Sequence, residues 1–429
     1  MFNSQVFVVD GLRSPFLKAN AKVGPGPFSA SELAVQAGKT LLLRQTFEPS
    51  EIDEIILGCT TPSVSEMNIA RVVSLRLNCS VQAPAWPVHR NCASGLQSID
   101  SAAQSICSGR SDLVLCGGTD SLSNAPLIFS KSASRWFSQF STAKGLRDKL
   151  VKVKDFKPSF LLPVISILKG LTDPVVGESM GQTAENLAKK FNLTRRELDE
   201  YSVRSHKQAL SSMEDVLKPQ TQQIYDAKGN FYEHDNGIRP DIKIEKLATL
   251  RAVFDKPDGK ITAGNSSQIT DGSALLLLAS EKAVKKFALK PLAIVKDINW
   301  SGLNPTEMGL GPIHALIPIL KRQKLERKDI DLWEINEAFA AQVLACQAAL
   351  DSFKYCSKVL KYRKTFGAIE PNKLNIAGGA IAIGHPVGAS GARIILNLIH
   401  LLKKNSLKRG LASICIGGGQ GGASLIELC

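Results

Sequence analysis

A short stretch near residue 90 contains the residue type best suited to covalent chemistry. Residues 90–98 (RNCASGLQS) begin as a polar turn of small residues, and apolar side chains then recur at helical spacing as far as Ile106. Cys92 is therefore expected at the N-terminus of a buried helix, where unpaired backbone N–H groups and the helix dipole favour an anion. This setting predicts a thiol pKa lowered from roughly 8.5 toward neutrality, which makes Cys92 a candidate nucleophile. The alternative is a small buried cysteine ahead of a core helix, and this stretch alone leaves both open.

Two stretches in the C-terminal half supply partners for such a nucleophile. His385 lies in a turn (GHP, residues 384–386) ahead of a helix expected over residues 392–402. Its imidazole can therefore project from a helix-entry loop and act as a general base. Cys415 ends an apolar strand, and the glycines at 417–419 could bring backbone N–H groups to a ligand, as an oxyanion hole requires. None of the other five histidines has a comparable context.

These residue types together suit acyl transfer through a thioester. A histidine can activate a cysteine nucleophile, and a second cysteine can move a proton at carbon or at the leaving thiol. A polar donor such as Asn336 can stabilise the thioester oxygen as it gains charge, by roughly 3 kcal/mol for each donor. We therefore expect Cys92, His385 and Cys415 to meet at one site, although they lie far apart in the sequence.

The length and composition of the chain limit the kind of protein that can hold such a site. With 429 residues, 44% hydrophobic and 21% charged, the chain is predicted to be a globular protein of two or three domains. Its nine cysteines are scattered without a CxxC pair, which signals neither a zinc site nor a disulfide framework and suits the cytosol. Residues 1–10 predict a β-strand rather than a signal peptide, and the longest apolar runs are too short to span a bilayer. We expect a cytoplasmic protein, with peripheral membrane association as an open alternative.

The positive charge of the chain is high and unevenly distributed. A net charge of +14 indicates an anionic partner, such as nucleic acid, an anionic membrane surface or a polyphosphate-bearing substrate. Half of it comes from residues 131–169, where nine basic and two acidic residues give +7 among interleaved aromatic side chains. This segment can lie on an anionic membrane or form a solvated basic flap, and both alternatives stay open. Nucleic acid is not expected as a partner, because no recognised binding module accompanies the charge.

The order of apolar strands and amphipathic helices predicts an α/β protein whose sheet is covered on both faces. The second half of the chain repeats the order of the first. Residues 330–336 mirror residues 52–58, and the helix opened by residues 388–391 (GASG) echoes the helix after Cys92. The repeat predicts two similar halves, with the active groups at the place where their loops converge.

Four sequence blocks resemble the catalytic signatures of the thiolase family, in the order of the family. They are NCASG at 91–95, NEAF at 336–339, GHP at 384–386 and CIGGG at 415–419, and two further similar segments are MGQTAEN at 180–186 and TAGNSS at 262–267. The resemblance covers essentially the whole chain.

This resemblance implies a particular fold, with two similar βαβαβαββ halves in a five-layered αβαβα body and an inserted loop domain. The N-terminal half is expected to comprise residues 1–125 and 258–285, and the C-terminal half residues 286–429. Residues 126–257 are expected to form the inserted loop domain, which contributes to the coenzyme A site and carries the basic segment. A homodimer or homotetramer is also implied.

The resemblance further implies a role for each catalytic residue. Cys92 would carry the acyl group, His385 would activate it, and Cys415 would be the acid/base at the α-carbon of the substrate. Asn336, through a bound water, and His385 would form one oxyanion hole. The backbone N–H groups of Cys92 and Gly417 would form the other.

Coenzyme A (CoA) is, by the same resemblance, a substrate, so neither a cofactor nor a metal is expected. Ser267 matches the serine that contacts the pantetheine, and Ala263 lies beside it. Phe254 and Arg239 match residues near the adenine and 3′-phosphate end, and Met180 of the loop domain completes the expected binding set.

Several positions depart from the commonest family pattern. Ser179 stands where short-chain biosynthetic thiolases have histidine, Thr119-Asp120 replace Met-Glu, and residues 131–174 form a longer stretch than in compact members. These features are more similar to the β-oxidation thiolases that partner a hydratase/dehydrogenase α-subunit in trifunctional complexes. In that group the loop segment is associated with membrane contact. Gln268 stands where a glycine is usual, at the expected pantetheine site.

The leading hypothesis is a 3-ketoacyl-CoA thiolase of fatty-acid β-oxidation, which cleaves 3-ketoacyl-CoA with CoA. An acetyl-CoA acetyltransferase that makes or degrades acetoacetyl-CoA uses the same residues, so the motifs do not separate the two. An acyl-carrier-protein condensing enzyme is disfavoured, because such enzymes generally have histidine or asparagine at the position of Cys415. A non-catalytic membrane or partner scaffold is the remaining alternative, which the complete catalytic set disfavours.

Overall fold

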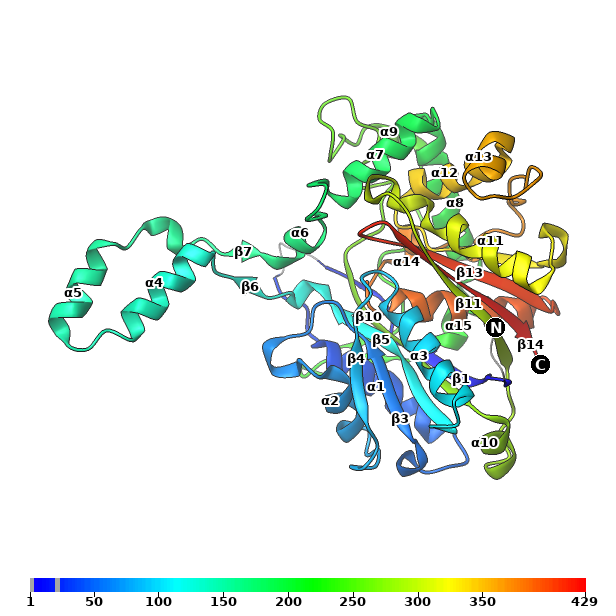
Figure 1. Ribbon diagram of the computed structural model, residues 1–429, viewed down its shortest axis with the longest axis horizontal. Coiled ribbons are helices and arrows are strands. Elements are labelled where there is room, and N and C mark those ends of the chain that lie inside the picture. Colours follow the sequence, from blue (N-terminus) through cyan, green and yellow to red (C-terminus); the bar gives the residue numbers. More distant parts are fainter. Residues whose placement is uncertain (1–3, 20–23) are drawn as a thin grey trace.

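The computed structural model describes residues 4–19 and 24–429, and Figure 1 shows one body with a long arm on one side. The centre of the body is a sheet whose neighbouring strands are, in order, β12 (Leu332–Ile335), β13 (Arg409–Ile416), β14 (Gln420–Leu428), β11 (Ala293–Gly302), β1 (Phe7–Arg13), β10 (Thr270–Ala279), β5 (Leu113–Ser121), β3 (Glu54–Gly58) and β4 (Ala85–Val88). A short strand, β2 (Leu17–Lys18), also pairs with β10.

The sheet consists of two halves with the same pairing pattern. In the N-terminal half β3 and β5 are parallel, whereas the pairs β5–β10 and β10–β1 are antiparallel. In the C-terminal half β12 and β13 are parallel, whereas the pairs β13–β14 and β14–β11 are antiparallel. The halves join where β1 pairs with β11 at Phe7–Ile294 and Val8–Ala293. The two similar α/β halves predicted from the sequence are confirmed.

Helices cover both faces of each half. The outer layer of the N-terminal half holds α1 (Ala30–Leu43) and α2 (Ile69–Arg76), the middle layer α3 (Ser94–Cys107) and α15 (Ser390–Lys404), and the outer layer of the C-terminal half α11 (Gly311–Gln323) and α12 (Ala340–Asp351). In β10, Leu276 packs in the middle layer and Leu277 in the outer one, because successive strand side chains point to opposite faces. Burial of each leucine contributes about 1.5–3 kcal/mol. The predicted αβαβα layering is confirmed.

The N-termini of α3 and α15 meet in the middle layer. A Cβ on Gly391 would lie 2.4 Å from the backbone nitrogen of Leu96, and a Cβ on Gly95 would lie 2.7 Å from the carbonyl oxygen of Gly388. Glycine at both positions therefore permits a backbone contact that any other residue would prevent. The contact brings together the two loops that precede these helices, and these loops carry the predicted nucleophile and the predicted base.

The first strand differs from its prediction. A strand over residues 5–9 ended by Asp10-Gly11 was expected, but β1 continues through both residues with a register shift between Val8 and Asp10. Gly11 is not a turn residue here, because a Cβ on it would lie 2.8 Å from Leu396 Cδ1. The glycine allows α15 to pack closely on the strand.

The inserted segment packs against the C-terminal half. Its helices α7 (Met180–Lys190) and α8 (Arg195–Ser211) contact α12, and the capping box predicted at Thr194 starts α8. The remaining helices of the body are α9 (Ile244–Ala248), α10 (Glu281–Lys286), α13 (Phe353–Lys358) and α14 (Ala380–Ile383), and a hairpin is formed by β8 (Ile224–Tyr225) and β9 (Phe231–Tyr232). The domain boundaries expected at 126–257 stay a prediction.

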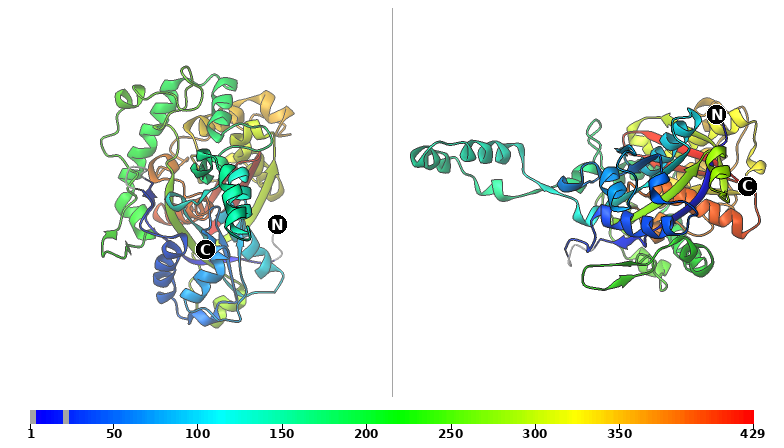
Figure 2. Two further views of the ribbon diagram at one scale, coloured as in Figure 1. Left: turned by 90° about the vertical axis from the view of Figure 1, so that its left-hand side faces the viewer. Right: turned by 90° about the horizontal axis from the view of Figure 1, so that it is seen from below.

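The basic segment forms an arm that extends from the body (Figures 1 and 2). It contains β6 (Leu127–Ile128), α4 (Lys131–Ser141), α5 (Leu146–Lys154), β7 (Val164–Ile165) and α6 (Ser166–Gly170), and β6 pairs with β7 at its base. Trp136 stacks on Phe140 with 5.1 Å between ring centroids and contacts Phe156 at 4.9 Å. The interleaved aromatic side chains thus form a small core within the arm. Across the described ranges, no helix is both long enough and apolar enough to cross a bilayer.

Candidate active site

A cavity of about 590 Å³ opens where loops from both halves meet the inserted segment. Asn91 and His385 contribute to its wall from the two central loops, and Phe339 contributes from the loop before α12. Helix α6 also contributes Ile167 and Leu168 to the wall. The cavity thus lies beside the predicted catalytic loops and at the root of the arm.

Cys92 lies two residues before α3, in a turn that hydrogen bonds hold closed. Ser94 Oγ accepts a hydrogen bond from the backbone N–H of Arg90 at 2.8 Å and donates one to the carbonyl of Asn91 at 2.7 Å. The Asn91 side chain donates to the carbonyl of Gly417 at 2.8 Å. These bonds tie the start of α3 to the loop after β13, so the predicted Cys92 and Gly417 loops are adjacent.

The environment of the Cys92 thiol differs from the prediction. Burial raises its pKa, and this exceeds the opposite effect of the backbone N–H groups of Gly417 and Cys92, which hydrogen-bond the sulfur. The predicted shift toward neutrality is wrong, because the helix N-terminus lies in the interior, where a thiolate loses its hydration. Formation of the thiolate therefore needs a base nearby.

His385 meets the requirements for that base. Its backbone N–H donates to the carbonyl of Gln268 at 3.2 Å, and its Nδ1 lies 2.6 Å from Ser390 Oγ. Because the Ser390 hydroxyl donates its proton to the carbonyl of Pro386 at 2.9 Å, Ser390 accepts from His385 and places the imidazole proton on Nδ1. Burial, with Arg393 adding to it, lowers the pKa of His385 to about 3, so the imidazole is neutral near pH 7. Nε2 then carries a lone pair, and within the described residues this buried atom has no hydrogen-bond partner.

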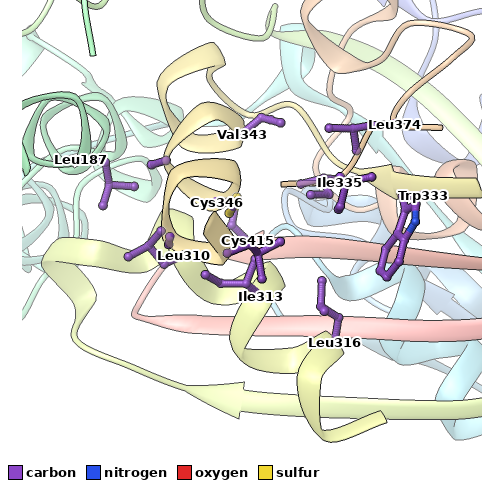
Figure 3. Packing of buried hydrophobic residues seen from close by; sticks show 14 of the residues in the cluster. Leu187, Leu310, Ile313, Leu316, Trp333, Ile335, Val343, Cys346, Leu374 and Cys415 are labelled. Carbon is purple, nitrogen blue, oxygen red and sulfur yellow. The ribbon is translucent and has the colours of Figure 1, made fainter. Parts of the chain in front are cut away.

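Cys415 is fully buried near the end of β13. Figure 3 shows its side chain beside Ile313 and Cys346, among the apolar residues that support α12. Burial raises the pKa of the Cys415 thiol well above its ordinary value, and Cys92 and Cys346 act in the same direction. The thiol is thus protonated at neutral pH and can donate a proton.

Asn336 follows β12 and has a fixed side chain. Its backbone N–H donates to the carbonyl of Ser413 at 2.9 Å, and its Oδ1 accepts from the Arg393 guanidinium at 3.0 Å. The Nδ2 group is buried, and no described residue accepts a hydrogen bond from it. An unpaired buried donor costs about 1–3 kcal/mol, so this group is available for a ligand oxygen or a bound water.

The residues predicted to bind CoA do not all lie together. Met180, Phe254 and Ser267 line the cavity. Ala263 is exposed and Arg239 half-buried, and neither contributes to the cavity wall. The backbone N–H of Arg239 instead donates to His206 Nδ1 at 3.1 Å. Their assignment to CoA stays a prediction.

The sequence motifs did not reveal the residues that hold the catalytic loops. Besides Ser390, these include Asp120, which accepts hydrogen bonds from Thr60, Thr61 and the backbone N–H of Gly388. Gln268 joins the inserted segment to the base loop, because its side chain donates to the carbonyls of Gly237 and Ile381. The only available signal was that Asp120 and Gln268 depart from the commonest family residues.

A protonated thiol, a neutral imidazole and a second thiol at the junction of two α/β halves define an acyltransferase of the thioester type. Comparison with known proteins supports this class. Residues 6–282 match the thiolase N-terminal domain and residues 289–428 match the thiolase C-terminal domain. The chain belongs to the thiolase family.

Relatives and solved structures of this family cover nearly the full length of the chain. The mitochondrial 3-ketoacyl-CoA thiolase of Mus musculus is 37% identical over 428 residues, which are 98% of each chain. The crystal structure of human mitochondrial 3-ketoacyl-CoA thiolase in complex with CoA has a TM-score of 0.85 and 35% identity, and the match covers 99% of this chain and 98% of that one. The Bacillus anthracis acetyl-CoA acetyltransferase matches over 100% of both chains, with a TM-score of 0.84 and 34% identity. The predicted family, fold and acyltransferase class are confirmed.

Proposed function

We propose that this chain is a thiolytic acyltransferase that cleaves 3-ketoacyl-CoA with CoA, as in fatty-acid β-oxidation. The observation that carries the proposal is a pair of buried polar atoms, His385 Nε2 and Asn336 Nδ2, without partners among the described residues. His385 belongs to the loop before α15, which contacts the start of α3 just after Cys92, and Asn336 belongs to the loop that follows β12. The names of the mouse and human relatives also support this activity.

In the first half-reaction, His385 Nε2 takes the proton of the Cys92 thiol, and the thiolate attacks the 3-keto carbon. The backbone N–H groups of Cys92 and Gly417 stabilise the resulting oxyanion, since they already point at the sulfur that forms the new bond. The bond between the α-carbon and the 3-carbon then breaks. Asn336, through a water, and His385 stabilise the enolate oxygen while the Cys415 thiol protonates the α-carbon, which releases acetyl-CoA.

In the second half-reaction, CoA enters as the acyl acceptor. The Cys415 thiolate left by the first step takes the proton of the CoA thiol, and the CoA sulfur attacks the Cys92 thioester. Cys92 leaves as a thiolate, and the acyl chain departs on CoA, two carbons shorter. The proton balance closes when His385 returns its proton to Cys92. Within this scheme CoA is a substrate and no cofactor takes part.

The cavity gives the CoA and acyl groups a place to bind. We assign the pantetheine to Ser267 and Met180, with Phe254 at the opening, and retain Ala263 and Arg239 as predicted contacts outside the cavity wall. The wall formed by α6 is apolar and includes Ile167 and Leu168, which suits an alkyl chain. A chain longer than acetoacetyl is therefore our preferred substrate.

The second candidate activity is that of an acetyl-CoA acetyltransferase, which the similarity to the Bacillus anthracis acetyl-CoA acetyltransferase supports. The two are separated by the rate of CoA-dependent cleavage of acetoacetyl-CoA and of 3-ketopalmitoyl-CoA, with a Cys92→Ser variant as the control. Faster cleavage of the long chain supports a β-oxidation enzyme, whereas faster cleavage of acetoacetyl-CoA supports the second candidate. Equal rates for the wild-type protein and the Cys92→Ser variant would refute both.

The arm is the proposed contact with a membrane or with a hydratase/dehydrogenase α-subunit. On α5 the exposed Leu150 and Val153 accompany Lys149 and Lys152, a combination that suits an anionic lipid surface. We expect the protein to sediment with vesicles of phosphatidylcholine and phosphatidylglycerol at physiological salt. Replacement of both lysines by glutamate should abolish sedimentation and leave thiolysis unchanged. Absence of sedimentation of the wild-type protein would refute the lipid assignment and leave the α-subunit as the partner to test.

A second copy of the chain is the other proposed partner. Strand β4 is the last strand of the sheet order, and its Trp86 is partly exposed, as edge strands that pair with other chains often are. We propose a homodimer through this edge, or a homotetramer built from two such dimers. We also propose that the protein is cytoplasmic. Light scattering after gel filtration measures the assembly, and a monomer would refute the proposal.

A further inference from the structure

One face of α15 holds polar side chains that reach both catalytic loops. Ser390, Arg393 and Asn397 are spaced by three and four residues, so they project from the same side of the helix. Ser390 accepts from His385 Nδ1, whereas the Arg393 guanidinium donates to Asn336 Oδ1 at 3.0 Å. The helix thus contacts the base directly through one residue and the proposed oxyanion donor through another.

The contact from Arg393 determines which end of the Asn336 amide faces the site. An asparagine side chain carries an acceptor oxygen at one position and a donor NH₂ at the other. Because a guanidinium has only donors, it can bond the amide only through Oδ1, which leaves Nδ2 as the free end. Rotation of the amide by half a turn would place Nδ2 against the guanidinium and direct an acceptor oxygen toward developing negative charge.

We propose that Arg393 is a positioning residue that fixes the Asn336 amide so that its Nδ2 donates to the bound water that stabilises the enolate oxygen of the substrate. The inference rests on the proposed function, since it assumes that Asn336 is an oxyanion donor. Neither the sequence blocks nor the resemblance assigned a role to Arg393.

A chain of buried polar side chains holds Arg393 in place. Its guanidinium lies 3.5 Å from Glu334 Oε2, and both side chains are 1% exposed. Asn397 Nδ2 donates to Glu334 Oε1 at 2.8 Å, and Gln220 of the inserted segment donates to Asn397 Oδ1 at 3.0 Å. Glu334 Oε1 accepts from Asn397 and Asn397 Oδ1 accepts from Gln220, so the orientation of both amides follows from the Glu334 carboxyl group beside Arg393. The planar fork of arginine suits this position, because separate N–H groups can face Glu334 and Asn336.

The test removes the guanidinium without leaving a buried charge. Loss of Arg393 alone would leave the buried Glu334 carboxyl group without its partner, so Arg393→Met is combined with Glu334→Gln, which retains an acceptor for Asn397. The matched control is Arg409→Met with Glu427→Gln, a pair joined at 2.6 Å near the opposite end of β13 from Cys415. Each pair of substitutions is introduced into the wild-type chain and into the Asn336→Ala variant, and kcat and KM for thiolysis are measured.

We expect the Arg393 pair of substitutions to lower kcat roughly 10- to 100-fold, because a misoriented Asn336 amide loses part of the roughly 100- to 1,000-fold effect of one oxyanion donor, with KM nearly unchanged. In the Asn336→Ala background the same pair should lower kcat less than about threefold, because residues that act through one another are not additive. The Arg409 pair should leave kcat near its starting value in both backgrounds. Arg393→Lys, which keeps a cation beside Glu334, gives the same comparison if the double variant does not fold.

Two results would overturn the inference. If the Arg393 pair leaves wild-type kcat unchanged, or if it lowers kcat equally in the Asn336→Ala background, then Arg393 does not act through Asn336. The proposed function has its own criterion. If Asn336→Ala alone leaves kcat unchanged, the oxyanion role of Asn336 is wrong and the inference falls with it.

Discussion

Replacement of Ser390 by alanine should slow the acyl-transfer reaction by removing the group that fixes the His385 tautomer. The Ser390 hydroxyl donates to Pro386 and accepts from His385 Nδ1 at 2.6 Å. Without that acceptor, the buried imidazole either leaves its Nδ1–H unpaired or moves the proton to Nε2. In the first case the imidazolium that forms when Nε2 takes the Cys92 proton is less stable, and in the second case the lone pair is no longer on Nε2.

The magnitude follows from the cost of an unpaired buried donor. That cost is about 1–3 kcal/mol, which corresponds to a roughly 5- to 150-fold lower kcat, since each 1.36 kcal/mol is a factor of ten. KM should change little, because Ser390 does not line the cavity. The assay is the initial rate of CoA-dependent cleavage of a 3-ketoacyl-CoA, with the free energy of unfolding measured in parallel.

Ser202→Ala is the matched control, because Ser202 is also a buried helical serine that donates to a carbonyl four residues earlier, at 2.8 Å. It should alter the free energy of unfolding about as much as Ser390→Ala and leave kcat near the wild-type value. A kcat for Ser390→Ala within twofold of both wild type and this control would refute the tautomer argument.

Two further predictions concern stability. Gly391→Ala should destabilise the protein by about 1–3 kcal/mol and lower kcat, because the added Cβ would lie 2.4 Å from the Leu96 backbone nitrogen and push α3 away from α15. Gly302→Ala is the control, because Gly302 has space for a Cβ. Equal urea midpoints for the two variants would contradict the prediction. Acidification from pH 7 to 5 should also destabilise the protein. Burial lowers the folded-state pKa of His385 to about 3 and of His206 to about 4, below an unfolded value near 6.5, so the unfolded chain binds more protons in this window and stability is lost as pH falls. His206→Gln should reduce the loss by about 1–2 kcal/mol in urea titrations, and an unchanged loss would contradict the assignment.

The catalytic loops were predictable because their reactive residues stand next to a local sequence pattern, the start of a helix, that positions them. Cys92 and His385 each precede a helix opened by small residues, and the repeated order of elements implied that these helices are equivalent. The glycines that let α3 and α15 touch are visible in the sequence, although the contact itself is not. Sequence order alone gives no distance between residues that are nearly 300 positions apart.

Other features depend on packing that a linear pattern does not contain. The raised pKa of Cys92 arises from burial, which outweighs the backbone N–H groups of Gly417 and Cys92. In the sequence, Asp10-Gly11 resembles a turn. In the structure the strand continues through both residues, and Gly11 is needed because α15 packs against it. The aromatic residues of the arm pack on Trp136 rather than standing free for a partner.

The backbone contact between Gly391 and Leu96 has a consequence for how ligands enter. Because the two halves touch at the catalytic loops themselves, a hinge motion between the halves would separate those loops and disrupt the site. Admission and release must instead take place at the rim, where α6 and the residues beside it close one side of the cavity. The body then acts as a fixed frame, and the cavity is reached from its rim at the root of the arm.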